Sequence, residues 1–319
     1  DVKRCAVFVF FDKDGIVDRY IETFLNGIKE NVERIVVVCN GDVDKRGMET
    51  FRNITEEVIV RPNEGYDITA YKCGLTHVSF DSLKEYDEVL LLNSTMFGPI
   101  YPFSEMFDSM NREDIDFWGM TNFHEVPYDP FGTIEYGYIP KHIQSFFMVF
   151  RQSLCLTDDF RDYWENLPEI TDYNEAIGFF ETVFTKKFAD KGYKWKVYAD
   201  SEELEGYTYD PLRDYPRYMI EKKRCPVMKK RSFFHDYGEA FSRSGGEAVR
   251  EVYNYIDRET GYDTDMIWET LLRLQNMADI KKRLSLNYIL SSRMPKNTEI
   301  KKIKKIALVI HIYFEDLAG

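Results

Sequence analysis

Continuous apolar runs alternate with segments of helical periodicity along the first third of the chain. The runs are rich in β-branched residues, which is typical of strands buried on both faces. The predicted strands are residues 5–11, 34–41, 57–62 and 88–94. Between them, apolar residues recur every three or four positions over 16–32 and again over 67–78, as on one side of a helix. This alternation predicts an α/β fold with a mainly parallel, doubly wound sheet.

The pattern continues less regularly in the second half. Residues 115–123 and 142–154 have the composition of strands and stand on either side of an aromatic loop. Residues 173–199 show an amphipathic helical pattern, which Gly192 ends as a C-cap before a further strand. We therefore expect the sheet to extend beyond its first four strands.

The last third of the chain becomes helical, and its charge changes. We expect a globular domain over residues 1–240, a helical extension with a basic linker over 241–300, and the first strand of a truncated second module over 301–319. Lys and Arg outnumber acidic residues between 281 and 305. A basic stretch is usually a solvated surface, and contact with an anionic membrane is the competing interpretation. The longest apolar run, IALVIHIYF, is too short to span a bilayer.

The amino-acid composition limits the classes of protein to which this chain can belong. The chain has 319 residues, of which 44% are hydrophobic, so it can bury a large core. Its formal net charge of -13 argues against nucleic acid as a partner. The five cysteines form no C-x-x-C pair, which predicts reduced, buried thiols in a cytoplasmic protein.

Polar residues follow the predicted strands. In parallel sheets, ligands bind outside the carboxyl ends of the strands, so these positions are candidates for a binding site. They are Asp12, Asn40, Arg61, Asn63, Asn93 and Ser94.

The loop after the third strand, RPNEGYDITAYKCGL (61–75), leads into a helix. Gly65 can take a positive φ at little cost, and Asn63 and Asp67 can cap the helix. The same backbone attracts a phosphate to the helix N-terminus, so a simple turn and a phosphate site remain alternatives.

The second half contains candidates for catalysis and for acceptor binding. Glu181 stands beside aromatic residues in the predicted helix. It is either the polar edge of that helix or a carboxylate in a cleft, with a raised pKa, that acts as a general base. Trp118 offers a flat stacking face, with a place in the core as the alternative. His142, Gln144 and Ser145 offer hydrogen-bonding groups, and a purely structural role stays open for His142 and Gln144.

The chain contains, in this order, the motifs FVFFDKDGIVDRYIETFL, RPNEGYDITAYKCGL, VLLLNSTMFGPIYP, DFWGMT, HIQSFFMVF and CPVMKKRSFF. Together they resemble the rhamnan synthesis protein F family of bacterial polysaccharide glycosyltransferases. The R-x-N-x-G loop with the A-Y-x-x-G-L after it is also similar to the donor-binding segment of the GT-A glycosyltransferase superfamily. The resemblance implies a GT-A-like fold. It also implies a nucleotide sugar bound by Asn63, Gly65, Tyr66 and Asp67, with Arg61 near the phosphates.

Two superfamily positions can be compared directly. The D-x-D motif that holds a divalent cation in GT-A enzymes is replaced here by Asn93-Ser94-Thr95. Amides and hydroxyls bind Mg²⁺ or Mn²⁺ poorly without a carboxylate, so we expect no tightly bound metal. Glu181 matches the base of inverting members by its spacing to Gly192-Tyr193, and Asp172 and Glu175 are the rival carboxylates.

The resemblance implies inverting transfer of L-rhamnose from dTDP-L-rhamnose to a growing cell-surface polysaccharide on a lipid carrier. The reaction would take place in the cytoplasm, at the inner face of the plasma membrane, with a further glycosyltransferase module in the full chain. Two alternatives stay open. A nucleotidyltransferase would need metal-binding carboxylates, which are missing after the fourth strand. An inactive scaffold of the same fold would still bind a nucleotide sugar or a glycan.

Overall fold

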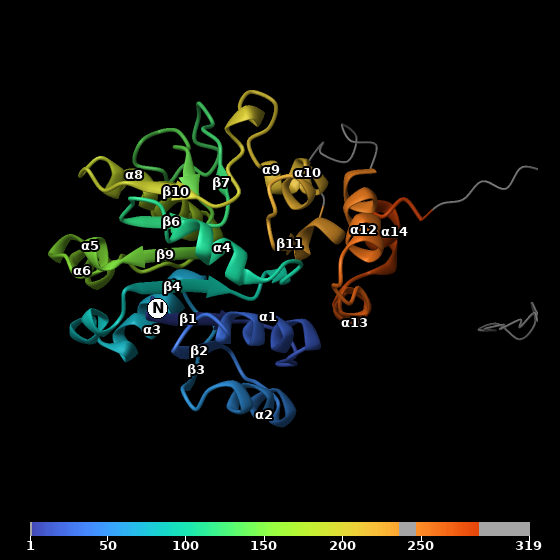
Figure 1. The fold of residues 1–319 in the computed structure, drawn as a ribbon, viewed down its shortest axis with the longest axis horizontal. Helices are drawn as coiled ribbons and strands as arrows, with labels where there is room; N and C mark the ends of the chain where they lie inside the picture. Colours follow the sequence, from blue (N-terminus) through green and yellow to red (C-terminus); the bar gives the residue numbers. More distant parts are fainter. Residues whose placement is uncertain (1, 236–246, 287–319) are drawn as a thin grey trace, which may run out of the picture. The chain divides into compact units, whose positions relative to one another are not determined.

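Seven strands form the main sheet of the computed structural model, which describes residues 2–235 and 247–286 (Figure 1). Their order is β10-β6-β9-β4-β1-β2-β3. Neighbouring strands are parallel, except that β9 runs antiparallel to both β4 and β6. The strands are β1 (Arg4–Phe10), β2 (Arg34–Asn40), β3 (Val58–Arg61), β4 (Glu88–Asn93), β6 (Phe117–Gly119), β9 (Phe147–Arg151) and β10 (Trp195–Val197). The predicted α/β class with a mainly parallel sheet is confirmed.

Helices cover both faces of this sheet. One face packs against α1 (Arg19–Lys29), α2 (Lys45–Ile54) and α4 (Phe103–Met110), and the other against α3 (Tyr66–Val78), α5 (Gln152–Cys155), α6 (Asp158–Glu165) and α8 (Thr182–Ala189). Side chains of β1 alternate between the two faces: Phe8 joins the first cluster and Val7 the second. The apolar runs predicted this two-sided burial, because neither face of a central strand meets water.

Each strand predicted in the second half is divided in the structure. Residues 115–123 form β6 and β7 (Asn122–Phe123), and residues 142–154 form β8 (His142–Ile143), β9 and α5. The short strands β7 and β8 pair with each other, and β5 (Met96–Phe97) pairs with β11 (Met228–Lys229). The break between β8 and β9, residues 144–146, lines a cavity.

The helix predicted from residue 173 is also interrupted. It consists of α7 (Tyr173–Ala176), a π-helical turn η2 (Ile177–Glu181) and α8. Gly192 follows the end of α8 with a φ of +97°, and its N–H donates to the carbonyl of Ala189 at 2.9 Å. The predicted glycine end of this helix is therefore confirmed.

The C-terminal helices belong to the same compact unit as the sheet, which extends from Asp1 to Leu286. They are α12 (Glu247–Glu259), α13 (Asp265–Leu274) and α14 (Met277–Arg283). Val252, Ile267 and Leu271 are buried in the apolar cluster that covers one face of the sheet. The predicted boundary at 240, most of the basic segment 281–305 and the strand predicted after 301 lie outside the described residues.

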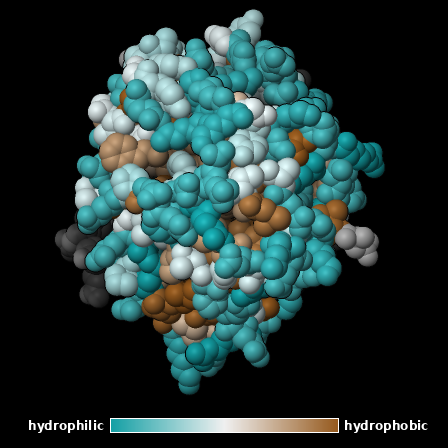
Figure 2. Space-filling model, turned by 90° about the vertical axis from the view of Figure 1, so that its left-hand side faces the viewer, coloured by the Kyte–Doolittle hydropathy of each residue, from teal (hydrophilic) through white to brown (hydrophobic). Residues whose placement is uncertain are grey.

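The remaining elements are short. They are η1 (Phe80–Glu85), η3 (Glu202–Leu204), α9 (Pro211–Asp214), α10 (Pro216–Glu221) and η4 (Lys230–Phe233). In the part of the chain that the structure describes, no helix combines the length and apolar character needed to cross a membrane. The face shown in Figure 2 is largely hydrophilic, with hydrophobic residues in small separate patches.

Candidate functional site

A cavity of about 600 Å³ lies beside the carboxyl end of β4 and the start of α3. The π-helical turn, the connection between β8 and β9, and the segment around β11 complete its wall. The predicted residues that line it are Tyr66, Asp67, Asn93, His142, Gln144, Ser145 and Glu181. The fold thus brings donor, acceptor and base candidates from distant parts of the sequence to one cavity.

The start of α3 has the backbone that the sequence predicted. Gly65 has a φ of +69°, and a Cβ there would lie 2.1 Å from Oγ1 of Thr69, so no other residue fits without a shift. Tyr66 also has a positive φ, of 55°. Strained backbone of this kind concentrates at functional sites.

The predicted side-chain cap of α3 is wrong. Gly65 is the N-cap residue, and within the described part of the chain α3 has no side-chain cap. The carboxylate of Asp67 instead accepts a hydrogen bond from Nδ2 of Asn93 at 2.8 Å. Asp67 therefore connects the start of α3 to the end of β4.

The Asn93-Ser94-Thr95 turn does not fit a divalent cation. Oδ1 of Asn93 accepts hydrogen bonds from the N–H and the hydroxyl of Thr95, at 3.1 and 2.6 Å. The oxygen that would bind a metal is thus used inside the turn. Within residues 2–235 and 247–286, no group of three or more His, Cys, Asp or Glu side chains could hold a metal ion. We therefore derive no step through a metal.

Glu181 ends the π-helical turn and is held by Ser145. The N–H of Ser145 donates to Oε2 of Glu181 at 3.1 Å, and the Ser145 hydroxyl donates to the same oxygen. Tyr71 supports this arrangement, because its hydroxyl donates to the carbonyl of Ser145 at 2.9 Å. One carboxylate oxygen is thus fixed, and among the described residues no donor bonds to Oε1. π-helical turns are frequent at functional sites.

The rival carboxylates have structural roles. Asp172 accepts a hydrogen bond from the N–H of Glu175 as the N-cap of α7. The carboxylate of Glu175 accepts from the N–H and the hydroxyl of Thr171, both at 2.8 Å. Neither residue lines the cavity. Glu181 is therefore the carboxylate of this segment that faces it.

Burial shifts two titratable groups of the cavity wall. Burial raises the pKa of Asp67 to about 6; the charge of Glu181 also raises it, and the hydrogen bond from Asn93 opposes the shift. Burial lowers the pKa of His142, which stacks on Phe123 with ring centroids 5.3 Å apart. Nδ1 of His142 lies 2.6 Å from the carbonyl of Pro140, so Nδ1 carries the proton of the neutral ring.

The cavity wall contains a buried ion pair that was not predicted from the sequence. Asp210 is bonded to Nζ of Lys229, and Nε2 of Gln144 donates to Oδ1 of Asp210 at 3.3 Å. Burial raises the pKa of Asp210, but the charges of Lys229 and Arg213 outweigh it, and the pKa is lowered overall. Lys229 belongs to the CPVMKKRSFF motif. The run of adjacent cationic residues in this motif was the sequence signal from which the ion pair could have been found.

Trp118 is not an acceptor residue, and this prediction was wrong. Its side chain is fully buried in the core, and Nε1 donates to Oε1 of Glu88 at 3.2 Å. The same carboxylate pairs with Arg4 and Arg151. The indole has no face available to a sugar ring.

The other predicted donor residues do not line the cavity. Asn40 is buried, donates from Nδ2 to the carbonyl of Tyr66 at 3.1 Å, and accepts from Arg61. Arg61 also donates to the carbonyl of Glu64 at 2.9 Å. These bonds hold the loop that begins α3. Asn63, Gly65 and Ser94 are likewise absent from the cavity lining.

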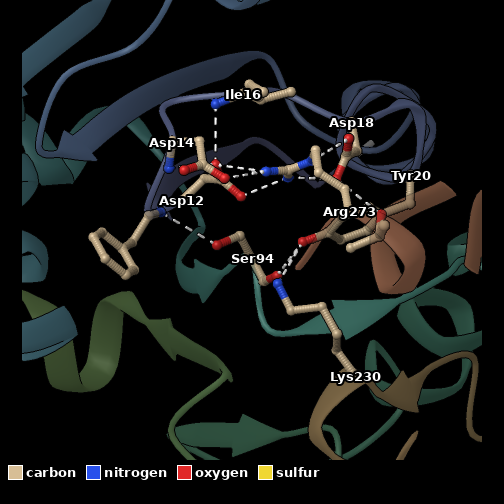
Figure 3. A network of polar contacts seen from close by, with 10 residues as sticks. Asp12, Asp14, Ile16, Asp18, Tyr20, Ser94, Lys230 and Arg273 are labelled. Atoms are coloured by element: carbon tan, nitrogen blue, oxygen red, sulfur yellow. Dashed lines mark hydrogen bonds and ion pairs between the residues drawn. The ribbon is translucent and has the colours of Figure 1, made fainter. Parts of the chain in front are cut away.

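Asp12 also lies off the cavity wall, where Arg273 of α13 binds it (Figure 3). Its Oδ1 accepts from the N–H groups of Asp14 and Ile16, at 3.0 and 3.1 Å. The carboxylate is thus fully engaged by the protein. A direct contact with a donor remains a prediction.

The family of the chain follows from its sequence. The sequence model of the rhamnan synthesis protein F family matches residues 35–319. The chain belongs to this family. An uncharacterised protein of Sinorhizobium fredii, y4gN, is 23% identical to this family member over 183 residues. These residues are 56% of this chain and 45% of the relative, so the match spans less than half of the relative's length.

Two solved structures are distantly similar to parts of this chain. Staphylococcus aureus TarS (residues 1–349) is 13% identical, with a TM-score of 0.38, over 88% of this chain and 70% of its own. Glucosyl-3-phosphoglycerate synthase from Mycobacterium tuberculosis, solved with Mn²⁺, UDP-glucose and phosphoglyceric acid, is 15% identical, with a TM-score of 0.33, over 48% and 58%. Both likenesses are too distant to transfer an activity.

Proposed function

We propose that this chain is a glycosyltransferase that moves a sugar from a nucleoside-diphosphate donor to a glycan hydroxyl with inversion. The observation that carries the proposal is the fixed carboxylate of Glu181 in a cavity at the carboxyl edge of the sheet. Membership of a family named for rhamnan synthesis supports it.

Glu181 is the proposed general base. Ser145 holds Oε2 and so directs Oε1 at an acceptor hydroxyl in the cavity. As the acceptor oxygen bonds to the anomeric carbon, its proton moves to Glu181, and the bond from that carbon to the diphosphate oxygen breaks. The carboxylate needs no further activation, because a hydroxyl proton becomes acidic as its oxygen bonds to carbon.

The departing diphosphate needs positive charge, which the protein supplies from two sides. The start of α3 presents exposed N–H groups and the positive end of the helix dipole. Lys229 of β11 and Arg231 of η4 line the cavity. Fixed cations and dipoles stabilise developing negative charge without reorganising during the reaction.

For the finer assignment we propose L-rhamnose, from dTDP-L-rhamnose, as the sugar. The family description supports it. Apolar side chains of the cavity, among them Ile139, Phe146 and Phe180, also suit the methyl group of a deoxysugar. We further propose a lipid-linked polysaccharide as the acceptor, at the cytoplasmic face of the membrane.

Turnover of a panel of nucleotide sugars by the wild type and by Glu181→Gln tests the proposal. Glu181→Gln keeps the shape and the hydrogen bonds but cannot take a proton, so kcat should fall by about a hundredfold or more while donor affinity holds. Glu175→Gln, a change in the same segment outside the cavity, is the control and should retain activity. Normal turnover in Glu181→Gln would refute the base assignment. Donor binding without turnover in the wild type would favour the inactive scaffold.

A further inference from the structure

Arg273 connects the C-terminal helices to the loop that follows β1 (Figure 3). Its Nη2 donates to Oδ2 of Asp12 at 2.6 Å and to Oδ2 of Asp18 at 2.7 Å. Its Nη1 lies 3.2 Å from Oδ2 of Asp14. One guanidinium thus joins carboxylates at the beginning, middle and end of the loop. The planar fork of arginine suits this role, which a lysine ammonium fills less well.

The ion cluster is largely shielded from water. The side chains of Arg273, Asp12 and Asp18 are 20%, 6% and 12% exposed, whereas that of Asp14 is 46% exposed. Asp18 also accepts from the hydroxyl of Thr270 on α13 at 2.9 Å. Removing one partner of a partly buried cluster leaves the other charges without compensation, which costs far more than losing a surface pair.

The loop also contacts the end of β4. The N–H of Phe11 donates to Oγ of Ser94 at 3.4 Å, and the hydroxyl of Tyr20 donates to the Ser94 carbonyl at 2.9 Å. Nζ of Lys230 lies 2.9 Å from the same tyrosine hydroxyl. The loop is therefore tied to the Ser94 turn through Phe11. Tyr20, in the first turn of α1 directly after the loop, connects the same turn to the cationic segment beside the cavity.

The positive charge of Arg273 is a second reason to expect an effect of this residue on donor binding. Without it, the loop would present the carboxylates of Asp12, Asp14 and Asp18 next to the sheet edge where an anionic donor is proposed to bind. Their repulsion would weaken binding of any nucleoside diphosphate. Arg273 neutralises part of this charge by pairing with all three carboxylates.

We propose that Arg273 is a positioning residue for the donor site, and that it makes the C-terminal helices part of the donor-binding unit. The proposal rests on the proposed function. Arg273 does not contact the sugar. It acts through the loop of residues 11–18 and the Ser94 turn, so its loss should affect donor binding more than the chemical step.

Arg273→Gln and Arg19→Gln form a matched pair of variants. Arg19 also joins α1 to α13, through Glu269 at 2.6 Å and Asp263 at 3.1 Å, but on an exposed surface and without contact to Asp12. We expect Arg273→Gln to raise the KM for the donor at least tenfold and to leave kcat within about threefold. Arg19→Gln should leave both unchanged within twofold. Arg273→Lys, which restores the charge but not the fork, should recover part of the affinity.

Hydrogen exchange of residues 11–18 separates this proposal from the proposed function. Faster exchange in Arg273→Gln than in Arg19→Gln, together with the raised donor KM, supports the positioning role. Faster exchange in a protein that binds no nucleotide sugar shows that Arg273 orders the loop but overturns its role at a donor site, and the proposed function has then failed as well. Equal exchange in the two variants, or equal donor KM values in an active enzyme, overturns it. If Arg273→Gln does not fold, Arg273→Lys decides: wild-type exchange and wild-type KM in that variant overturn the proposal.

Discussion

Replacing Asp67 by Asn should stabilise the protein at neutral pH. Burial raises the pKa of this carboxyl from 3.8 to about 6, so at pH 7 the folded protein holds an ionised group that the cavity wall disfavours. Asn keeps the shape and can still accept the hydrogen bond that Nδ2 of Asn93 now donates to Oδ2. The substitution therefore removes the charge and little else.

The size of the effect follows from linkage. A shift from 3.8 to about 6 corresponds to about 3 kcal/mol of lost stability once the group is ionised. Part of the side chain faces the cavity, where water screens its charge, so we expect a gain of about 1–2 kcal/mol. For a domain of this size that is a rise in Tm of about 2–4 °C.

The pH dependence has a definite sign. The folded state binds the proton of Asp67 more tightly than the unfolded state, so the carboxyl costs nothing below about pH 4. Its penalty grows as the pH rises to about 6 and is complete above it. We expect the difference in Tm between wild type and Asp67→Asn, measured by thermal melting from pH 4 to 8, to increase with pH over this range. Glu64→Gln, which removes an exposed carboxylate of the same loop, is the control. A destabilised Asp67→Asn at pH 8, or a difference independent of pH, would refute the reasoning.

Three further predictions concern packing, backbone and metal. Trp118→Phe should lower the free energy of unfolding by about 1–3 kcal/mol in urea titrations, because it opens space and leaves Glu88 without one donor, while the acceptor KM stays unchanged. Gly65→Ala should lower the free energy of unfolding more than Gly132→Ala. Both glycines have a positive φ, but an added Cβ would clash with Thr69 at residue 65 and would meet no neighbouring atom at residue 132. Turnover should persist in EDTA, and complete loss that Mn²⁺ or Mg²⁺ restores would contradict the weak-metal expectation.

The central sheet was predictable because each of its long strands corresponds to a local run of apolar residues in the sequence. Residues 5–11 and 88–94 read as buried strands from composition alone, and the structure places β1 and β4 side by side within them. Helix α2 was not anticipated, since only Gly47, Phe51 and Ile54 of its ten residues are buried and its apolar stripe is narrow. The antiparallel placement of β9 was not predicted, because strand direction is set by chain connections and not by residue pattern.

The candidate site was only partly predictable for a related reason. Asp67 was found from turn chemistry and Asn93 from its place at a strand end, while the family resemblance supplied Tyr66 and supported Glu181; all four line the cavity. Trp118 was misplaced because an aromatic residue near a strand end fits a core and a stacking platform equally well. No local pattern indicates that it would meet Glu88.

The cationic side of the cavity shows how tertiary pairing completes such a site. Lys229 pairs with Met96 in the small β5–β11 sheet, and the N–H of Lys230 donates to the carbonyl of Thr95 at 3.1 Å. These bonds hold the cationic segment against the turn where GT-A enzymes place their D-x-D carboxylates. In the proposed transfer, side-chain cations therefore stand where a carboxylate-bound metal would otherwise stabilise the diphosphate. The missing D-x-D and the adjacent cations are then one feature of the site, although the two segments lie far apart in the sequence.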